Sequence, residues 1–520
     1  MMLSKKQLKS FSLICSFFLL FQGVLVAQNA SVAEQKRNDY KGKEPKYVFL
    51  FIGDGFGLSQ ANAAEAFLSS EDKNVGIKKL NLSKFPAQGF YTTHAHNRYI
   101  TGSAAAGTAL ATGHKTSIST ISMCPSKQKP LKTVAELAKE KGMKVGVISS
   151  VSIDHATPAV FYAHQPERSN YYEIDVQLSE SNFDFFGGGG LKCPEGNSDD
   201  LAALKAGSTG IDNGDNSVSN KKKNAIELAK ERAYKYINTK ADFEKLSPKD
   251  GKVIAVSPVL CGGSALRYSI DQTDEDITLA QFTAKGIEML DNKNGFFMMV
   301  EGGKIDWTCH RNDAATAIHE VIDFDNAIAE AIDFYNNHPK ETLIVVVGDH
   351  ETGGLTMGFA GSHYESAFKK LKHQKVSGDA FDVKVKNYIK SCQGKTPEFS
   401  VVLDMIKKDY GLGDESKGLE LKDFELDQLR NAFVRYMEKG NETDEQSYLL
   451  YGGYNPLTVK ITHLLAHKAG ISWTTFSHTG TPIPARAMGP GQDLFSGYFD
   501  NTDIPKNIMK LIGVEFPVVN

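Results

Sequence analysis

The sequence predicts an α/β protein in which a central, mostly parallel sheet is flanked by helices. Continuous apolar runs at 47–52, 296–300 and 343–347 are typical of strands that are buried on both faces of such a sheet. Helical patterns alternate with these runs along the chain. Each run is followed by glycine and by an acidic or imidazole side chain. Because ligands bind at the carboxyl ends of parallel strands, we expect a site there.

Other segments extend this prediction in chain order. Runs at 144–149 and 252–256 resemble the first three strands, and helices are predicted at 133–141, 225–236 and 313–335. The segment 187–223 is rich in Gly, Asn, Ser and Lys and should be mostly loop. Its first four residues are glycines without the Lys-Ser/Thr ending of a nucleotide-binding loop, so we expect a turn.

The N-terminus has the pattern of a secretory signal peptide. Lys5, Lys6 and Lys9 precede an apolar run at 11–26, and Ala27 offers a cleavage point. A retained membrane anchor is the alternative, but the run is shorter than the ~20 residues that a spanning helix needs. The sequence therefore predicts a signal peptide at 1–27 and an exported protein, periplasmic or secreted, with no membrane association after cleavage.

Composition and net charge limit the classes of partner that the protein can bind. The chain has 520 residues, of which 41% are hydrophobic and 23% charged, as in ordinary globular proteins. The net charge of -3 gives no basic excess to neutralise the phosphates of a nucleic acid. Nucleic acid is therefore not expected as a partner, whereas a small anionic substrate remains open.

Side chains of the kinds that bind metal ions gather at the predicted strand ends and near them. Carboxylate with imidazole is the ligand set of zinc, and carboxylate with hydroxyl suits magnesium. Asp306 and His310 lie four residues apart, so one helical turn can present both to one ion. The candidates are Asp54, Glu301, Asp306, His310, Asp349, His350 and His478. By contrast, His463 and His467 have no carboxylate partner and are interpreted as structural.

The segment 101–113 supplies a candidate nucleophile. Alanine and other small residues after Ser103 favour a helix that begins at this serine. The free N–H groups at a helix start attract anions, and a serine beside zinc can ionise. The alternative is that Ser103 only caps the helix.

Five segments together resemble the alkaline phosphatases. They occur in that family's order and span 47 to about 490. They are Gly53-Asp54-Gly55, the Thr-x-Ser-Ala-Ala segment at Ser103, 300–310 with Glu301, Asp306 and His310, 348–354 with Asp349 and His350, and Ser477-His478-Thr479-Gly480.

The resemblance implies two zinc ions and one magnesium ion. It assigns the first zinc to Asp306, His310 and His478, and the second to Asp54, Asp349 and His350 with Ser103 as the reactive group. It assigns the magnesium to Asp54, Glu301 and Thr157. Arg168 matches the family's phosphate-binding arginine, and a guanidinium suits this role because its fork donates two bonds to phosphate oxygens.

The chain also departs from the family's pattern. Many relatives carry an acidic residue immediately before the nucleophile that helps to hold the arginine, whereas Gly102 stands here. Arg168 should therefore be more mobile or anchored elsewhere. His155 and Trp307 occupy two positions near the magnesium site that vary in the family.

The resemblance implies hydrolysis of phosphate monoesters through a phosphoserine on Ser103, with the family's catalytic domain at 46–520. The alternatives are a phosphodiesterase or nucleotide pyrophosphatase of the same superfamily, or a non-catalytic metal- or phosphate-binding protein. A homodimer remains open. An accessory insertion is predicted at about 357–470, and the segment between His350 and His478 is expected to cover the cleft. Leu429, Phe433 and Met437 in it need an apolar partner, either the main body or a second subunit.

Overall fold

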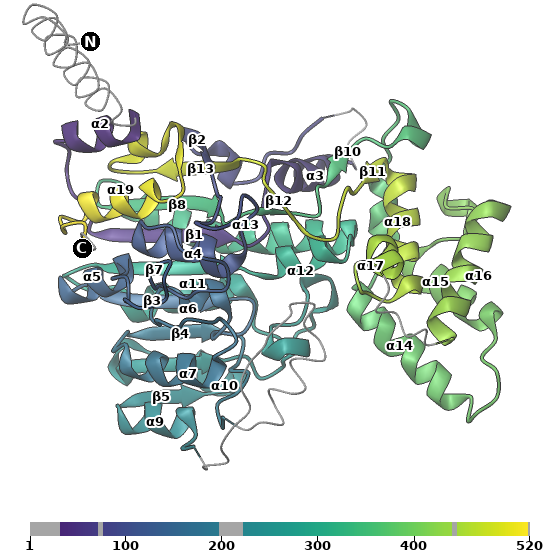
Figure 1. Ribbon diagram of the computed structural model, residues 1–520, viewed down its shortest axis with the longest axis horizontal. Helices are drawn as coiled ribbons and strands as arrows, with labels where there is room; N and C mark the ends of the chain where they lie inside the picture. Colours follow the sequence, from purple (N-terminus) through teal and green to yellow (C-terminus); the bar gives the residue numbers. More distant parts are fainter. Residues whose placement is uncertain (1–31, 71–75, 197–221, 439–444, 518–520) are drawn as a thin grey trace, which may run out of the picture.

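The computed structural model describes residues 32–70, 76–196, 222–438 and 445–517 (Figure 1). The predicted signal peptide at 1–27 lies outside these residues. Within the described ranges, every helix is too short or too polar to cross a membrane.

A ten-stranded sheet forms the centre of the molecule. Its order is β14-β2-β13-β8-β1-β7-β3-β4-β6-β5. In that order the strands are Gly497–Asp500, Ala87–Thr92, Ile483–Met488, Thr342–Gly348, Tyr47–Gly53, Phe296–Gly302, Lys144–Ser149, Phe185–Gly188, Lys252–Val256 and Tyr234–Ile237. Among the described strands of this sheet, only β13 runs antiparallel to its neighbours, β2 and β8. The predicted mostly parallel sheet is confirmed.

Strand β1 shows why the central strands are apolar throughout. Every residue of β1 is buried. Phe49 and Phe51 belong to the hydrophobic cluster on one face, whereas Val48, Leu50 and Ile52 belong to the cluster on the other. Because successive side chains of a strand point to opposite faces, two covered faces require an uninterrupted apolar run.

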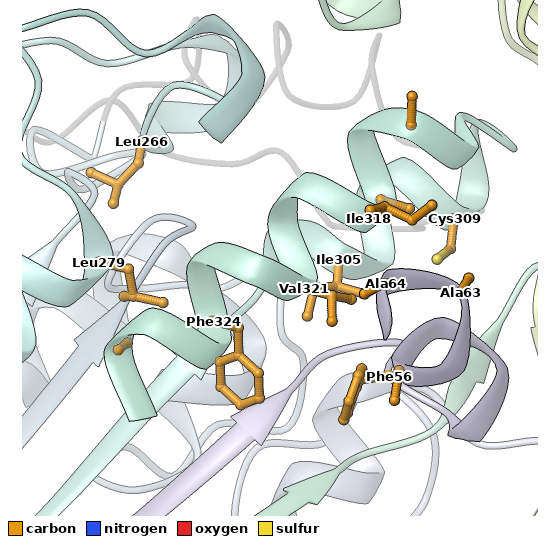
Figure 2. Close-up of a cluster of buried hydrophobic side chains, with 14 of the residues drawn as sticks. Phe56, Ala63, Ala64, Leu266, Leu279, Ile305, Cys309, Ile318, Val321 and Phe324 are labelled. Atoms are coloured by element: carbon orange, nitrogen blue, oxygen red, sulfur yellow. The ribbon is translucent and has the colours of Figure 1, made fainter. Parts of the chain in front are cut away.

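Helices cover both faces of the sheet. One face carries α3 (Leu58–Ser69), α11 (Leu279–Leu290), α12 (Lys304–His310) and α13 (Ala314–Asn337), and Figure 2 shows Phe56, Ala63, Ile305 and Phe324 of this face. The other carries α4 (Ser103–Thr112), α5 (Val134–Glu140), α6 (Ala156–Ala159), α7 (Tyr171–Glu180), α9 (Ala225–Glu231) and α19 (Asp503–Leu511). The remaining helices of the body are α2 (Val32–Asp39) and α10 (Lys240–Glu244).

The helix predicted at 225–236 is wrong in its second half. Helix α9 ends at Glu231, Ala233 has a φ of 65°, and β5 follows at once. A left-handed alanine stops a helix. Tyr234 and Ile237 are then buried as β5 pairs with β6 at the edge of the sheet, so tertiary packing overrides the local helical pattern.

The glycine run at 187–190, predicted as a turn, begins inside a strand. Gly187 and Gly188 belong to β4, which pairs with β3 and β6. Gly188 has a φ of 124°, and a Cβ there would lie 1.8 Å from the carbonyl oxygen of Ser149. These glycines therefore permit close backbone approach in the sheet. Residues 197–221 of the predicted loop are outside the described ranges.

Most of the segment between His350 and His478 forms a helical group at one side of the body (Figure 1). Its helices are α14 (Gly378–Ser391), α15 (Phe399–Tyr410), α16 (Asp423–Met437), α17 (Glu445–Tyr451) and α18 (Pro456–Ala469). Two short antiparallel pairs join its ends: β9 (Glu351–Thr352) with β12 (His478–Thr479), and β10 (Thr356–Met357) with β11 (Ile471–Ser472).

The apolar stripe of α16 packs inside this same group. Leu429 and Phe433 are buried, α16 lies against α18, and the rings of Phe433 and Phe399 are 5.7 Å apart. Met437 packs against the same core. The apolar partner of this stripe is therefore a helix of the same segment. The sequence predicted only the main body or a second subunit as the partner.

Candidate active site

Parallel pairing brings three carboxylates to one edge of the sheet. Gly53 at the end of β1 is in register with Gly302 of β7 and with Gly348 of β8. Asp54 and Asp349 directly follow two of these glycines, and Glu301 directly precedes the third. All three carboxylates are fully buried. The strand-end site expected from the sequence is therefore assembled here.

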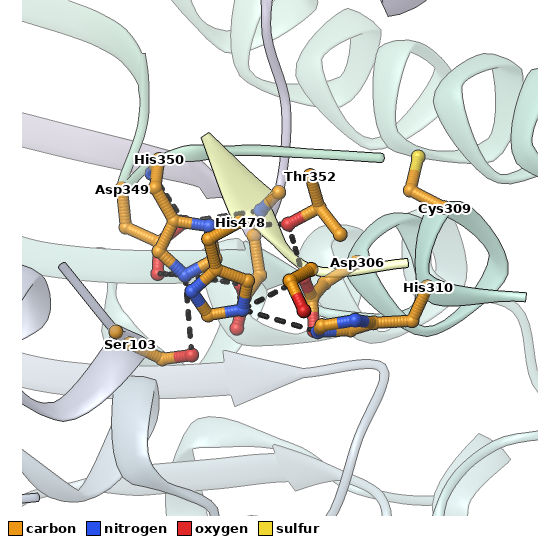
Figure 3. A network of polar contacts seen from close by, with 12 residues as sticks. Ser103, Asp306, Cys309, His310, Asp349, His350, Thr352 and His478 are labelled. Carbon is orange, nitrogen blue, oxygen red and sulfur yellow. Dashed lines mark hydrogen bonds and ion pairs between the residues drawn. The ribbon is translucent and has the colours of Figure 1, made fainter. Parts of the chain in front are cut away.

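Asp306, His310 and His478 form the first group of polar side chains (Figure 3). His310 Nε2 lies 3.1 Å from His478 Nε2 and 3.4 Å from Asp306 Oδ2. His478 Nε2 lies 3.6 Å from Asp306 Oδ1. His310 and Asp306 share a face of α12, whereas His478 comes from β12, far along the chain.

Neighbouring groups fix the orientation of these ligand atoms. His310 Nδ1 donates to the carbonyl oxygen of Phe476 at 2.6 Å, and His478 Nδ1 donates to that of Thr101 at 2.8 Å. Each Nε2 is thereby left facing Asp306, as in imidazoles that bind metals. Thr352 Oγ1 donates to Asp306 Oδ1 at 2.6 Å.

Asp54, Asp349, His350 and Ser103 form the second group. His350 Nε2 lies 3.5 Å from Asp54 Oδ1, 3.2 Å from Asp349 Oδ2 and 3.5 Å from Ser103 Oγ. Asp349 Oδ1 accepts from the backbone N–H of Gly55 and of His350, so its second oxygen faces the group. The ligand atoms of Asp54, Asp349 and His350 all lie within 4.8 Å of one another.

The third group surrounds Asp54 from the other side. Thr157 Oγ1 donates to Asp54 Oδ2 at 3.2 Å, and Ser149 Oγ donates to Glu301 Oε2. One ligand atom each of Asp54, His155 and Glu301 lies within 4.8 Å of the others. Asp54 thus belongs to the second and to the third group, as the resemblance implies. His155, expected only near the magnesium site, lies beside Asp54 and Glu301.

The buried carboxylates lack partners among the described residues that would compensate a negative charge. Asp54 Oδ1, Glu301 Oε1 and Asp349 Oδ2 are buried without a hydrogen-bond partner among the described residues. Burial and, to a smaller extent, the charge of Asp306 raise the pKa of Asp54 to about 7. Burial and, to a smaller extent, the charge of Asp54 raise the pKa of Glu301 and of Asp349 well above the usual range. Such oxygens need a cation or a proton. A carboxylate-imidazole donor set fits zinc, and the carboxylate-hydroxyl set fits magnesium.

The imidazoles differ in charge state. Burial, and then His478, lowers the pKa of His350 well below its usual value. Burial opposes protonation of His310 too, but Asp306 raises its pKa to about 9. His350 is therefore a neutral ligand as it stands, whereas His310 must release a proton to bind a cation.

Ser103 is the first residue of α4, as predicted. Gly102, in an extended conformation, occupies the N-cap position, so Ser103 is the first helical residue and not the cap. The serine is buried, with Oγ directed at His350 Nε2. Capping, the alternative interpretation, therefore does not account for its position.

Arg168 is anchored by a residue other than the one that the family pattern provides. Its Nη2 donates to His155 Nε2 at 2.9 Å. Burial, and then Arg168 itself, lowers the pKa of His155 well below its usual value, so the ring is a neutral acceptor. Trp307 packs edge-on against that ring at 6.0 Å. Arg168 is thus held by His155, and position 102, a glycine, has no side chain that could contact it.

His463 and His467 lie outside the site. His463 Nε2 contacts Asn312 Oδ1 at 3.0 Å, and His467 stacks on Phe359 at 4.0 Å. Both are structural, as predicted.

Comparisons with known proteins agree with this geometry. The family model described as Alkaline phosphatase matches residues 45–514. Alkaline phosphatase 3 of Bacillus subtilis is 31% identical over 486 residues, which cover 93% of this chain and 92% of that protein. Alkaline phosphatase 4 of the same organism is 30% identical over 502 residues, covering 95% and 94%.

Solved structures show the same fold. A cold-active alkaline phosphatase from Shewanella sp. is 28% identical, with a TM-score of 0.70 over 90% of this chain and 99% of that chain. The enzyme from the Antarctic bacterium TAB5 is 25% identical, with a TM-score of 0.60 over 91% and 100%. Sequence, fold and site together lead to one conclusion: the chain belongs to the alkaline phosphatase family, whose members are phosphoric monoester hydrolases.

Proposed function

We propose that this chain hydrolyses phosphate monoesters by way of a phosphoserine on Ser103. The observation that carries the proposal is the position of Ser103 Oγ, at the start of a helix and 3.5 Å from His350 Nε2. A helix start favours a phosphate because its N–H groups and dipole attract anions. The serine thus meets the substrate where negative charge is stabilised.

Two zinc ions and one magnesium ion would complete the site. Asp306, His310 and His478 would hold one zinc, and Asp54, Asp349 and His350 the other. Asp54, Glu301 and Thr157 would hold the magnesium. Support comes from the unpartnered buried oxygens of Asp54, Glu301 and Asp349. A TAB5 alkaline phosphatase variant, 25% identical to this chain, was solved with Mg bound in its M3 site.

The chain's own groups then act in two steps. Ser103 Oγ attacks phosphorus, its proton is released, and the bond to the leaving oxygen breaks to give phosphoserine and an alcohol. Water then attacks the phosphoserine, phosphate leaves, and Ser103 regains a proton. When bound, the cations supply Lewis acidity that lowers the pKa of the serine hydroxyl and of water and stabilises the leaving oxygen. Arg168 would donate to the non-bridging phosphate oxygens.

A monoester and a diester that release the same alcohol would test the reaction class. We expect a strong preference for the monoester in kcat/KM, together with three bound metal ions per chain. A preference for the diester would favour the phosphodiesterase or nucleotide pyrophosphatase alternative. Metal or phosphate binding without turnover would favour a binding protein.

The remaining proposals concern organisation. Residues 1–27 would be a signal peptide and the mature enzyme would be periplasmic or secreted. The basic and then apolar pattern of the N-terminus supports this.

Residues 46–520 would form the catalytic domain, with an accessory insertion at about 357–470. The two short strand pairs that join the ends of the insertion support this division. A homodimer, which the sequence leaves open, stays a prediction.

His155→Ala should weaken inhibition by inorganic phosphate by about threefold to tenfold, because a charge-assisted hydrogen bond that orients Arg168 is lost. The phosphate inhibition constant at saturating zinc and magnesium gives the measurement. Trp307→Phe keeps an aromatic ring beside His155 and is the matched control. Unchanged inhibition in His155→Ala would show that Arg168 is positioned by other groups.

A further inference from the structure

Two exposed tyrosines lie at opposite ends of β12, the strand that carries His478. Tyr99 is 78% exposed, and a Cβ at Gly480 would lie 2.7 Å from its Cε1, so its ring rests on that glycine. Tyr448 of α17 is 48% exposed, and its hydroxyl lies 3.1 Å from Ser477 Oγ. Ser477 and Gly480 flank the short strand, so both rings are tied to the same piece of backbone.

This backbone borders the reacting groups. Thr101, two residues after Tyr99, accepts the hydrogen bond from His478 Nδ1 through its carbonyl oxygen. Ser103 then begins α4, and its Oγ faces the metal-ligand groups. One tyrosine therefore comes from the segment that leads into the nucleophile, and the other from the helical group that the sequence predicted to cover the cleft.

Exposed apolar residues neighbour both tyrosines along the chain. Ile100 beside Tyr99 is half-exposed, and Leu449 and Leu450 beside Tyr448 are exposed too. Single apolar side chains at a surface need no explanation, but several that gather at a site indicate a ligand. The two rings and these aliphatic side chains suit an apolar, planar ligand group. The exposed residue on the other side of Tyr99 is the charged Arg98.

We propose that Tyr99 and Tyr448 form a subsite for an aromatic leaving group of the phosphate monoester. The inference rests on the proposed function: with phosphorus at Ser103, the ester's alcohol portion extends outward to the rim. Aromatic rings bind other planar groups by stacking or by edge-to-face contact. The subsite would select aryl-bearing or base-bearing esters, and α17 would be the part of the helical group that makes this selection.

Two esters with alkyl leaving groups of similar acidity isolate binding from leaving-group chemistry: 2-phenylethyl phosphate and ethyl phosphate. The wild-type enzyme should favour the phenyl-bearing ester by about fivefold or more in kcat/KM, given the size of aromatic contacts. Tyr99→Ala and Tyr448→Ala should each lower this preference by about threefold to fivefold, mainly through the KM of the phenyl-bearing ester.

Control variants separate stacking from general damage. Tyr99→Phe and Tyr448→Phe keep the rings and should keep the preference. Gly480→Val places side-chain atoms where the Tyr99 ring rests and should reproduce Tyr99→Ala. Tyr498→Ala removes a comparably exposed ring from β14 and should leave the preference unchanged.

Four outcomes would decide against the proposal or its basis. A wild-type preference near one, or an unchanged preference in both alanine variants, would overturn the subsite. The subsite would also be overturned if the alanine variants altered the oligomeric mass in solution and left the ester preference unchanged. The rings would then contact a second copy of the chain. Hydrolysis of neither ester by the metal-loaded wild type would overturn the proposed function instead.

Discussion

Ser103→Ala is expected to lower kcat on a phosphate monoester by about a thousandfold or more, because the covalent route is lost. In the structure, Ser103 Oγ faces His350 Nε2 within a buried site, and the N-cap position of α4 belongs to Gly102, so capping does not explain the serine. Alanine preserves the helix start and leaves every proposed metal ligand in place. Metal content should therefore equal that of the wild type.

Trapping the covalent intermediate gives the measurement. Wild-type enzyme incubated with labelled phosphate at acidic pH, then denatured, should retain label on the peptide that contains Ser103, and Ser103→Ala should retain none. Thr112→Ala, at the other end of α4, is a matched control for changes in the helix, because its hydroxyl accepts from and donates to groups of the helix and its turn in the described part of the chain. Wild-type turnover by Ser103→Ala would remove this residue from the nucleophile role.

The strand-end carboxylates were predictable because they follow apolar runs directly. Parallel pairing aligns Gly53, Gly302 and Gly348, and the positions of Asp54, Glu301 and Asp349 follow from it. Their partners were not predictable in the same way. The carbonyl groups of Phe476 and Thr101 orient His310 and His478. Every residue has a backbone carbonyl, so the sequence does not show which ones accept these hydrogen bonds.

Side chains that support the ligands were also missed. Thr352 donates to Asp306, and Ser149 donates to Glu301. Thr352 lies two residues after the predicted ligand His350, and this closeness was an available signal. Ser149 ends a predicted strand, but only the pairing of β3 with β7 brings it to Glu301. The contact between Arg168 and His155 had no such signal, because it depends on how two loops of the fold meet. Gly102 indicated only that the usual anchor was missing.

Removal of metal ions should abolish activity and destabilise the fold together. Chelation would leave Asp54, Glu301 and Asp349 buried with unpartnered oxygens, so these groups would have to take up protons or repel one another. A ligand present at a thousand times its dissociation constant stabilises a fold by about 4 kcal/mol. We therefore expect the Tm of the chelated enzyme to fall by several degrees, and zinc with magnesium to restore both Tm and turnover.

Substitution of single ligands should show which ion each of the three groups binds. His478→Ala should lose the zinc assigned to Asp306 and His310 while it retains the other two ions, because neither group of ligand atoms around Asp54 includes His478. His350 lies near His478 as well, but it keeps Asp54 and Asp349 as neighbours in the variant. His463→Ala is the matched control: it removes a histidine that contacts Asn312 outside the site and should keep all three ions. Metal content by elemental analysis decides the result. Full activity in a metal-free sample, or three ions retained by His478→Ala, would contradict the assignment of this histidine and of the group to which it belongs.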